Sequence, residues 1–232
     1  MDQKEFGFEV AALGAEVVEL IKRIGQLAGG IDPARQQRLA IYCALLGRWQ
    51  KTVNLVAAST VEDVWQRHFE DSIQLLPLAG ADWRNWVDLG SGAGFPGMVI
   101  AIVAGDENRT VHLVDSDKRK IAFLREVSRE TCTKAEIHTG RIENVLPGMA
   151  SRIRFDVVSA RALAPLSKLI DLAHPTLEKG AVGLFLKGKG WSRELTDVAD
   201  DGSINITLVD SQTDAGAKIV VVRGHNSQTK SV

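Results

Sequence analysis

Apolar side chains recur at helical spacing through the first 84 residues of the chain. Residues 8–28 carry one such stripe, which stops at Gly29-Gly30 and consists of Leu13, Val17, Leu20, Ile21, Ile24 and Leu27. Asp32-Pro33 then supplies the capping acid and first-turn proline that begin a helix. The inner face of this second helix is predicted to hold Leu39, Tyr42, Cys43, Leu46 and Trp49.

A third helix is predicted to begin at Thr60-Val-Glu-Asp63, which resembles a capping box with a shorter acid at its fourth position. Its inner side would carry Val61, Trp65, Phe69, Ser72 and Leu76, and it would end near Pro77. Since no strand pattern interrupts these helices, we expect residues 1–84 to form an N-terminal helical extension.

From Trp86 onward, short apolar runs alternate with helical segments, as in a doubly wound α/β sheet. The predicted strands are Trp86–Leu89, Thr110–Asp115, Ala135–Thr139, Phe155–Ala160, Ala181–Lys187, Ser203–Val209 and Lys218–Arg223, and the predicted helices are 97–104, 117–130, 165–173 and about 191–199. Only a turn-rich stretch separates the last two strands, which indicates an antiparallel hairpin. We therefore expect a Rossmann-like domain at residues 85–224, with a seven-stranded, mostly parallel sheet, and a flexible tail at 225–232.

Composition narrows the class of protein further. The 232 residues are 45% hydrophobic and 25% charged, with a net charge of −1, so any nucleic acid would be met by a local basic patch. Cys43 and Cys132 have neither disulfide nor metal-ligand spacing. The N-terminus lacks the apolar core of a signal peptide, and the longest apolar run, 98–104, is too short to span a bilayer. We expect a cytoplasmic monomer with no metal and no membrane partner.

The glycine-rich stretch Trp86-Val-Asp-Leu-Gly-Ser-Gly-Ala-Gly-Phe-Pro-Gly97 is the strongest candidate for a ligand site. A buried strand that ends in glycines and leads into a helix forms the nucleotide-binding corner of such a sheet. Gly92, Gly94 and Gly97 also fit the dinucleotide pattern, so an NAD-dependent oxidoreductase is one alternative. Against it stand the absence of a hydride-transfer constellation and the acid Asp88, which would accept N–H groups of the glycine loop.

The carboxyl ends of the other parallel strands bring further candidates to the same edge of the sheet. They are Asp115, Arg141-Ile142-Glu143, Arg161 and Lys187. Asp115 would accept hydrogen bonds from ribose hydroxyls, although it could instead cap the helix that begins near Asp117.

Basic residues suggest where a nucleic acid would bind. Lys187 and Lys189 follow the fifth strand and are candidates for RNA contacts, whereas Arg67 and Asp71 have the spacing of an ion pair on a helix surface. His68 lies near the apolar face of its helix, where a core or interface position is the default interpretation.

With these residues in place, the chain resembles a known family. Val87–Gly97 is similar to motif I of S-adenosylmethionine-dependent methyltransferases. Its Gly-Phe-Pro-Gly ending is similar in particular to the bacterial small-subunit ribosomal RNA guanine-N7 methyltransferase G family, also called glucose-inhibited division protein B. Further matches run in the family's order from about residue 35 to 223: Trp49, Asn54-Leu55, Arg67-His68-x-x-Asp71-Ser72, Leu113-Val-Asp-Ser116, Lys118-Arg119, Arg141-Ile-Glu143, Ala160-Arg161-Ala162 and Leu186-Lys-Gly188.

The resemblance implies a class I methyltransferase fold and S-adenosylmethionine as the methyl donor. The implied partner is 16S ribosomal RNA or the 30S particle, methylated at N7 of a guanine in the decoding-region loop. Implied cofactor contacts are Gly90, Gly92, Phe95, Asp115, Ile142, Glu143 and Arg161, with Asp115 on the ribose and Ile142-Glu143 beside the adenine. The resemblance also implies that Arg67, His68, Asp71 and Ser72 lie near the mouth of the site. It makes Arg67 and His68 candidates for RNA contacts. Two positions depart from the family pattern, Val56 and Ala160, where threonine and serine are usual.

The absence of two catalytic motifs from the sequence is consistent with methylation at guanine N7. Guanine N7 has a lone pair and no proton, so its methylation requires alignment rather than a general base. The chain lacks the Asn/Asp-Pro-Pro-aromatic motif used on exocyclic amines and the Pro-Cys pair used on pyrimidine C5. We therefore assign no catalytic acid or base. A non-catalytic, cofactor-sensing RNA-binding module is a further alternative.

Overall fold

The computed structural model describes residues 30–61, 63–198 and 202–224. The predicted helix within residues 8–28 and the predicted tail at 225–232 lie outside this range. No helix in the described ranges has the length and hydropathy needed to cross a membrane.

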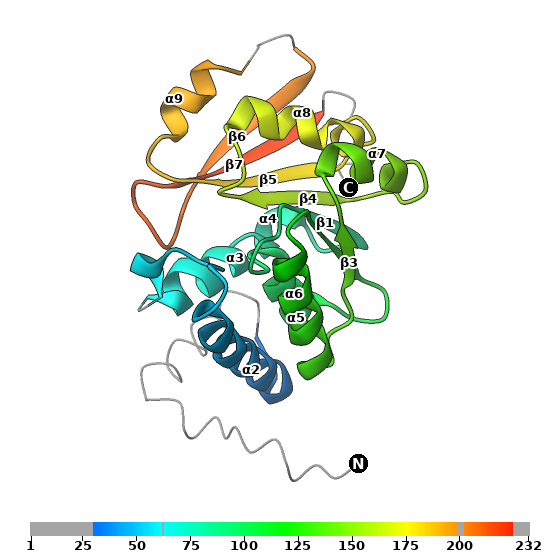
Figure 1. The fold of residues 1–232 in the computed structure, drawn as a ribbon. Helices are drawn as coiled ribbons and strands as arrows, with labels where there is room; N and C mark the ends of the chain where they lie inside the picture. The colour runs from blue at the N-terminus through cyan, green and yellow to red at the C-terminus, as the bar shows by residue number, and fades with distance from the viewer. Residues whose placement is uncertain (1–29, 62, 199–201, 225–232) are drawn as a thin grey trace.

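Seven strands form one sheet in the order β3-β2-β1-β4-β5-β7-β6 (Figure 1). Their bounds are β1 Asn85–Leu89, β2 Thr110–Asp115, β3 Glu136–Thr139, β4 Val157–Arg161, β5 Val182–Lys187, β6 Ile204–Asp210 and β7 Lys218–Gly224. The first five strands are parallel to one another, and β7 is antiparallel to both β5 and β6. The predicted mostly parallel sheet with its C-terminal hairpin is confirmed.

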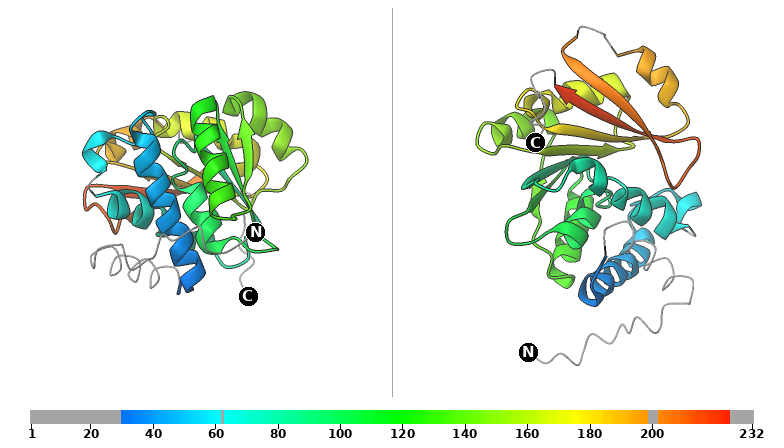
Figure 2. Two further views of the ribbon diagram at one scale, coloured as in Figure 1. Left: turned by 60° about the horizontal axis from the view of Figure 1, so that its bottom comes forward. Right: turned by 180° about the vertical axis from the view of Figure 1, so that it is seen from behind.

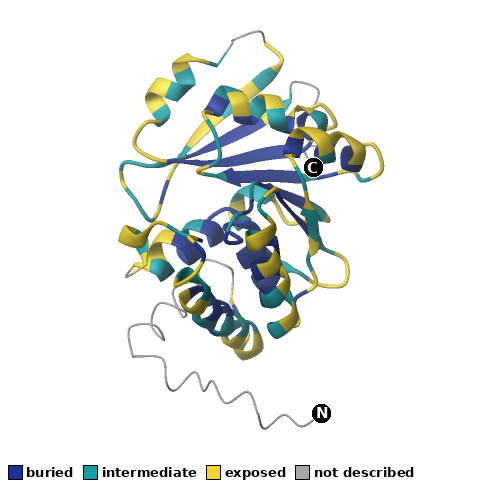
Figure 3. Cartoon of the chain, viewed as in Figure 1, coloured by how far each residue is buried: buried dark blue, intermediate teal, exposed yellow. Residues whose placement is uncertain are grey.

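Helices cover both faces of the sheet, so the central strands are buried except at Asn85, where β1 begins, and Arg161, where β4 ends (Figure 3). One face packs against α2 Pro33–Gln50, α5 Gly97–Ala104 and α6 Lys118–Glu130. The opposite face packs against α7 Ile142–Ala150 and α8 Leu166–Leu177. The short helix α9 Trp191–Thr196 follows β5 and packs beside α8, at the same end of the sheet as the hairpin (Figure 2).

The N-terminal segment adds a further layer to the α5–α6 side. Asp32 caps α2 by accepting a hydrogen bond from the Arg35 N–H at 2.8 Å, and Pro33 is its first residue, as predicted. Leu39, Tyr42 and Leu46 are buried. The helix thereby extends the core beyond the sheet and towards the glycine loop.

The single helix predicted from Thr60 to Pro77 is wrong. The chain instead forms a 3₁₀ turn at Ala58–Thr60 (η2), a π-helix at Trp65–Glu70 (η3), and two short α-helices, α3 Asp71–Ile73 and α4 Leu76–Ala79. Val61 is 39% exposed rather than buried, and Pro77 lies in the first turn of α4 instead of ending a helix. Thr60, Arg67, His68 and Asp71 of this segment line the site described below.

Helix α7 was not predicted. Pro147 and Gly148 lie within it, and both disfavour a helix in its interior. Burial of Ile142, Leu146 and Met149 against the sheet overrides this local preference.

Candidate active site

Asp88 holds the glycine loop in place from within the core. Its side chain is fully buried at the end of β1, where Oδ2 accepts a hydrogen bond from the Gly97 N–H at 3.2 Å. The Ser159 hydroxyl donates to Oδ1 at 2.7 Å and itself accepts from the Trp86 indole at 2.8 Å. Burial raises the pKa of Asp88 to about 6, against the lowering effect of these hydrogen bonds. The predicted role of Asp88 in organising the loop is thus observed at Gly97.

Two glycines show why the loop has its composition. Gly94 has φ +96°, and a Cβ placed there would lie 2.6 Å from the Tyr42 hydroxyl oxygen. Gly90 has φ +64°, and its Cβ would lie 2.5 Å from Leu163 Cδ1. A side chain at either position would therefore combine backbone strain with a steric clash.

Asp115 joins the end of β2 to the glycine loop. One carboxylate oxygen accepts from the Gly92 N–H at 2.8 Å, and the other accepts from the Asp117 N–H at 2.8 Å. Helix α6 is capped by Asp117, which accepts from the Arg119 N–H at 2.8 Å. The alternative in which Asp115 caps this helix is therefore not what the structure shows.

An aromatic stack supports the loop from the side of the N-terminal segment. Phe95 stacks on Tyr42, with ring centroids 5.3 Å apart, and on His68, at 4.9 Å. The Tyr42 hydroxyl donates to the Ala93 carbonyl, and burial raises its pKa well above the ordinary value, so it stays a donor. Sequence periodicity identified Tyr42 only as a core residue, because nothing in a helical stripe marks a contact across 51 positions.

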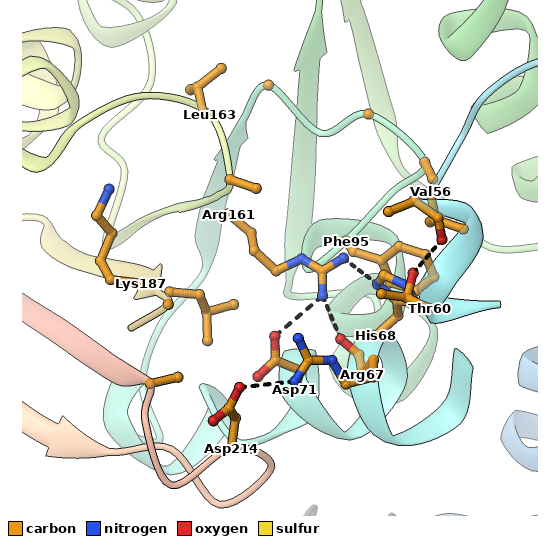
Figure 4. A pocket seen from close by; sticks show the side chains of 18 of the residues that line it. Val56, Thr60, Arg67, His68, Asp71, Phe95, Arg161, Leu163, Lys187 and Asp214 are labelled. Carbon is orange, nitrogen blue, oxygen red and sulfur yellow. Dashed lines mark hydrogen bonds and ion pairs between the residues drawn. The ribbon is translucent and has the colours of Figure 1, made fainter. Parts of the chain in front are cut away.

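Arg161, at the end of β4, is held by the π-helix (Figure 4). Its guanidinium donates to the Arg67 carbonyl at 2.7 Å, to Asp71 Oδ2 at 3.2 Å, and to Nδ1 of His68. His68 Nε2 lies 2.8 Å from the Thr60 hydroxyl, which donates in turn to the Ala57 carbonyl at 2.7 Å. Because His68 Nδ1 accepts from Arg161, the proton of the neutral ring is on Nε2.

His68 is neutral at physiological pH. Burial, followed by the charges of Arg161 and Arg67, lowers its pKa to about 3. The ring fixes the Arg161 guanidinium over Phe95, with 5.3 Å between the guanidinium carbon and the ring centroid.

The predicted ion pair between Arg67 and Asp71 is wrong. Arg67 pairs with Asp214 in the β6–β7 loop at 2.9 Å, while Asp71 pairs with Arg161. The physical reason is the π-helix, whose wider turn does not stack residues four apart as an α-helix does. Asp71 also accepts from the Thr213 hydroxyl at 2.8 Å, so both acids tie this helix to other parts of the site.

Lys187, at the end of β5, is buried. Its ammonium donates to the Ala164 carbonyl at 2.7 Å and lies 2.5 Å from Glu194 Oε2. Lys189 is exposed beside the β6–β7 loop, where its side chain approaches Gly216.

These elements enclose a cavity of about 670 Å³, within the range of small-molecule sites. Of the residues predicted from the sequence, its lining includes Gly90, Gly92, Phe95, Arg161, Lys187, Arg67 and His68. Asp115, Ile142, Glu143 and Lys189 lie outside that lining. Ile142 and Glu143 form the first turn of α7, with Ile142 buried and Glu143 exposed. Sequence reasoning missed Glu194 and the β6–β7 loop, since neither carries a motif.

The sheet and its glycine corner define a class of fold, that of the class I methyltransferases. Two solved structures share the fold. An O-methyltransferase from Bacillus cereus, in complex with SAH, aligns with a TM-score of 0.56 at 12% identity, covering 88% of this chain and 97% of that one. A methyltransferase from Geobacter sulfurreducens aligns with a TM-score of 0.52 at 15% identity, covering 87% and 96%.

Sequence comparison then identifies the family. The family model described as rRNA small subunit methyltransferase G matches residues 35–216. A ribosomal RNA small subunit methyltransferase G from Paramagnetospirillum magneticum is 47% identical over 194 residues, which cover 84% of this chain and 91% of the relative. Its counterpart from Parvibaculum lavamentivorans is 45% identical, covering 81% and 82%. The chain belongs to the rRNA small subunit methyltransferase G family, which decides against the nicotinamide alternative.

Proposed function

We propose that this protein transfers a methyl group from S-adenosylmethionine to N7 of a guanine in small-subunit ribosomal RNA. The family resemblance points to guanine 527 of the 16S RNA. The choice of N7 rests on the side chains around the cavity that could act as a general base. Among the described residues, His68, Asp71 and Asp214 line it with both side-chain polar atoms engaged, and Glu194 is ion-paired with Lys187 through Oε2. An acceptor that must lose no proton suits such a site.

The residues of the glycine corner fit the methyl donor. Gly90 and Gly92 adopt positive φ, and both face the cavity. Each Asp115 oxygen accepts one backbone N–H and keeps a lone pair for a ribose hydroxyl. Ile142 and Glu143 would flank the adenine, and Phe95 and Arg161 would border the methionine part. When bound, S-adenosylmethionine supplies an electrophilic methyl group on a sulfonium.

Sheet topology favours a separate place for the acceptor. The strand order reverses between β1 and β4, which is where ligands bind in open parallel sheets. A donor held at the ends of β1, β2 and β3 would leave the ends of β4 and β5 for the target base. Arg67 and Lys189, both exposed, would contact RNA at the rim, with Lys187 and His68 deeper in the site.

Mapping the modification tests the function directly. Small-subunit RNA from cells with and without this gene would be compared by borohydride–aniline cleavage, which breaks the chain at 7-methylguanosine. We expect one cleavage site that disappears with the gene and returns when the gene is restored. Unchanged cleavage, with RNA binding intact, would instead indicate the non-catalytic module. We further propose a cytoplasmic monomer, which cell fractionation and size-exclusion chromatography of the protein would test, and methylation of free RNA against 30S particles would show which is the substrate.

A further inference from the structure

Lys187 and Glu194 place a hydrogen-bond donor and an acceptor side by side in the cavity. The ammonium and the Glu194 Oε2 are 2.5 Å apart, and their side chains are 7% and 30% exposed. Backbone groups fix both partners. The Ala164 carbonyl accepts from Lys187 at 2.7 Å, and Glu194 Oε2 accepts from the Leu166 N–H at 2.8 Å, at the start of α8. The pair is therefore held in one orientation before any ligand arrives.

Among the described acids that line the cavity, Glu194 is the one with a carboxylate oxygen that contacts no other protein group. Asp71 and Asp214 each have both oxygens engaged with neighbouring residues. Both contacts that Glu194 makes within the described part of the chain involve Oε2, so Oε1 is available to a ligand. A carboxylate repels phosphate groups, so in an RNA-binding cavity its natural partners are the N–H groups of a base.

The chemistry of guanine matches this pair. Along one edge, guanine presents the acceptor O6 beside the donors N1–H and N2–H₂. Adenine presents the opposite order at the corresponding positions, a donor amine beside the acceptor N1. An ammonium next to a carboxylate can therefore pair with guanine and not with adenine.

The order of elements across the sheet matches the order of atoms around the base. The glycine loop follows β1, Arg161 ends β4, Lys187 ends β5, and Glu194 lies on α9 beyond it. Figure 4 shows Lys187 on the far side of Arg161 from His68. In guanine, O6 lies between N7 and N1–H. A base with O6 at Lys187 and N1–H at Glu194 thus turns N7 towards the glycine loop.

We propose that Lys187 and Glu194 are the specificity-determining pair that selects guanine, with Lys187 donating to O6 and Glu194 accepting from N1–H and N2–H₂. The inference rests on the proposed function and names the residues that recognise its target base. In this proposal Lys187 hydrogen-bonds to the base, and the exposed cations at the rim contact the phosphates.

A substrate–variant cycle tests this pair. Small subunits would be reconstituted with RNA that carries either guanosine or inosine at the position that the wild-type protein methylates. Inosine keeps N7, O6 and N1–H and lacks only the 2-amino group. Methyl transfer would be measured for the wild type, Glu194→Gln and the control Asp197→Asn, an exposed acid directly after α9.

For the wild type we expect guanosine to exceed inosine by about tenfold in kcat/KM, the value of one hydrogen bond to a charged group. In Glu194→Gln this ratio should fall to about two, while the Kd for S-adenosylmethionine is unchanged. Asp197→Asn should keep the wild-type ratio. Because the ratio is measured within one preparation, it does not depend on the fraction of the variant that is folded.

Two different failures can be told apart. If Glu194→Gln slows both substrates equally and keeps the wild-type ratio, Glu194 has only a structural role and the inference is overturned. If the wild-type protein forms no 7-methylguanosine on any small-subunit RNA, the proposed function fails first, and the inference with it.

Discussion

Asp88 shows how one residue balances burial against the organisation of the loop. A fully buried carboxylate is costly when ionised, and four groups partly offset that cost: the Ser159 and Ser91 hydroxyls, the Gly97 N–H and the charge of Arg161. Its pKa of about 6 means that the folded protein binds a proton at Asp88 more tightly than the unfolded chain does. The ionised form is retained because only a carboxylate can accept from both a hydroxyl and the backbone of the loop.

This balance predicts a pH-dependent difference in stability between the wild type and Asp88→Asn. The stabilisation due to the raised pKa is fully present below pH 4 and is lost as pH rises through about 6. The wild-type free energy of unfolding, relative to that of the variant, should therefore fall by about 3 kcal/mol between pH 4 and pH 7. Urea denaturation of both proteins across this range measures it. A difference that is constant with pH would show that Asp88 is ionised throughout.

The glycine loop allows steric clash to be separated from backbone strain. Gly94 and Gly92 both have positive φ, but a Cβ at Gly92 would meet nothing closer than the Gly90 carbonyl oxygen at 3.8 Å. At Gly94 it would lie within 3 Å of Tyr42, Met98 and Leu124. We expect Gly92→Ala to cost about 1 kcal/mol and Gly94→Ala about 2 kcal/mol more, measured by urea denaturation. Equal losses would mean that the core around Gly94 can relax.

At the scale of elements, strands were predicted from sequence to within two residues at each end. Buried parallel strands are short apolar runs between glycines and polar turns, and these signals are local. Two helical regions were not predictable in the same way. Helix α7 contains Pro147-Gly148 and is stabilised by its contact with the sheet, and the segment from Thr60 to Leu76 makes its polar contacts with distant residues, Arg161 and Asp214.

The features of the candidate site likewise divide into those that local sequence predicts and those that depend on distant contacts. The glycine loop, Asp88 and the strand-end positions of Arg161 and Lys187 follow from motif and topology. The partners of these side chains do not, because Arg161 contacts a residue 90 positions away and Arg67 contacts one 147 positions away. Such pairings depend on the π-helical turn at Trp65–Glu70, which no periodicity in the sequence indicates.

Gln74 connects the helical segment to the β6–β7 loop and makes the strength of this connection measurable. Its buried amide donates to the Ser211 hydroxyl at 3.3 Å and accepts from the Gln212 N–H at 2.8 Å. Gln74→Ala removes both contacts, so backbone amides of residues 211–217 should exchange with deuterium about tenfold faster or more. The exposed neighbour Gln66→Ala is the control. Unchanged exchange in Gln74→Ala would show that the loop is held by its own turn contacts.

At the scale of the whole molecule, the cavity is lined by residues from the N-terminal segment, from the ends of the central strands and from the β6–β7 loop. A ligand that fills it links these parts, and stabilises the folded state by mass action. S-adenosylmethionine at 100 times its Kd should add about 2.7 kcal/mol, which for a chain of this size raises Tm by roughly 5–10 °C.

Thermal unfolding monitored by circular dichroism measures this shift. Asp115→Ala should lose most of it, since the ribose would lose two charge-assisted hydrogen bonds. NADH serves as the second control and should leave Tm unchanged. A shift with NADH and none with S-adenosylmethionine would contradict the proposed cofactor.

The contacts between the π-helix and the β6–β7 loop also determine when, during synthesis, the protein can first enclose a base. Asp214 leaves the ribosome 147 residues after its partner Arg67. At about 5–20 residues per second, that interval is roughly 7–30 s. Throughout it, the glycine corner and the first strands can already assemble, while the wall on the hairpin side does not yet exist. A nascent copy is therefore unable to enclose a base until the β6–β7 loop has been synthesised.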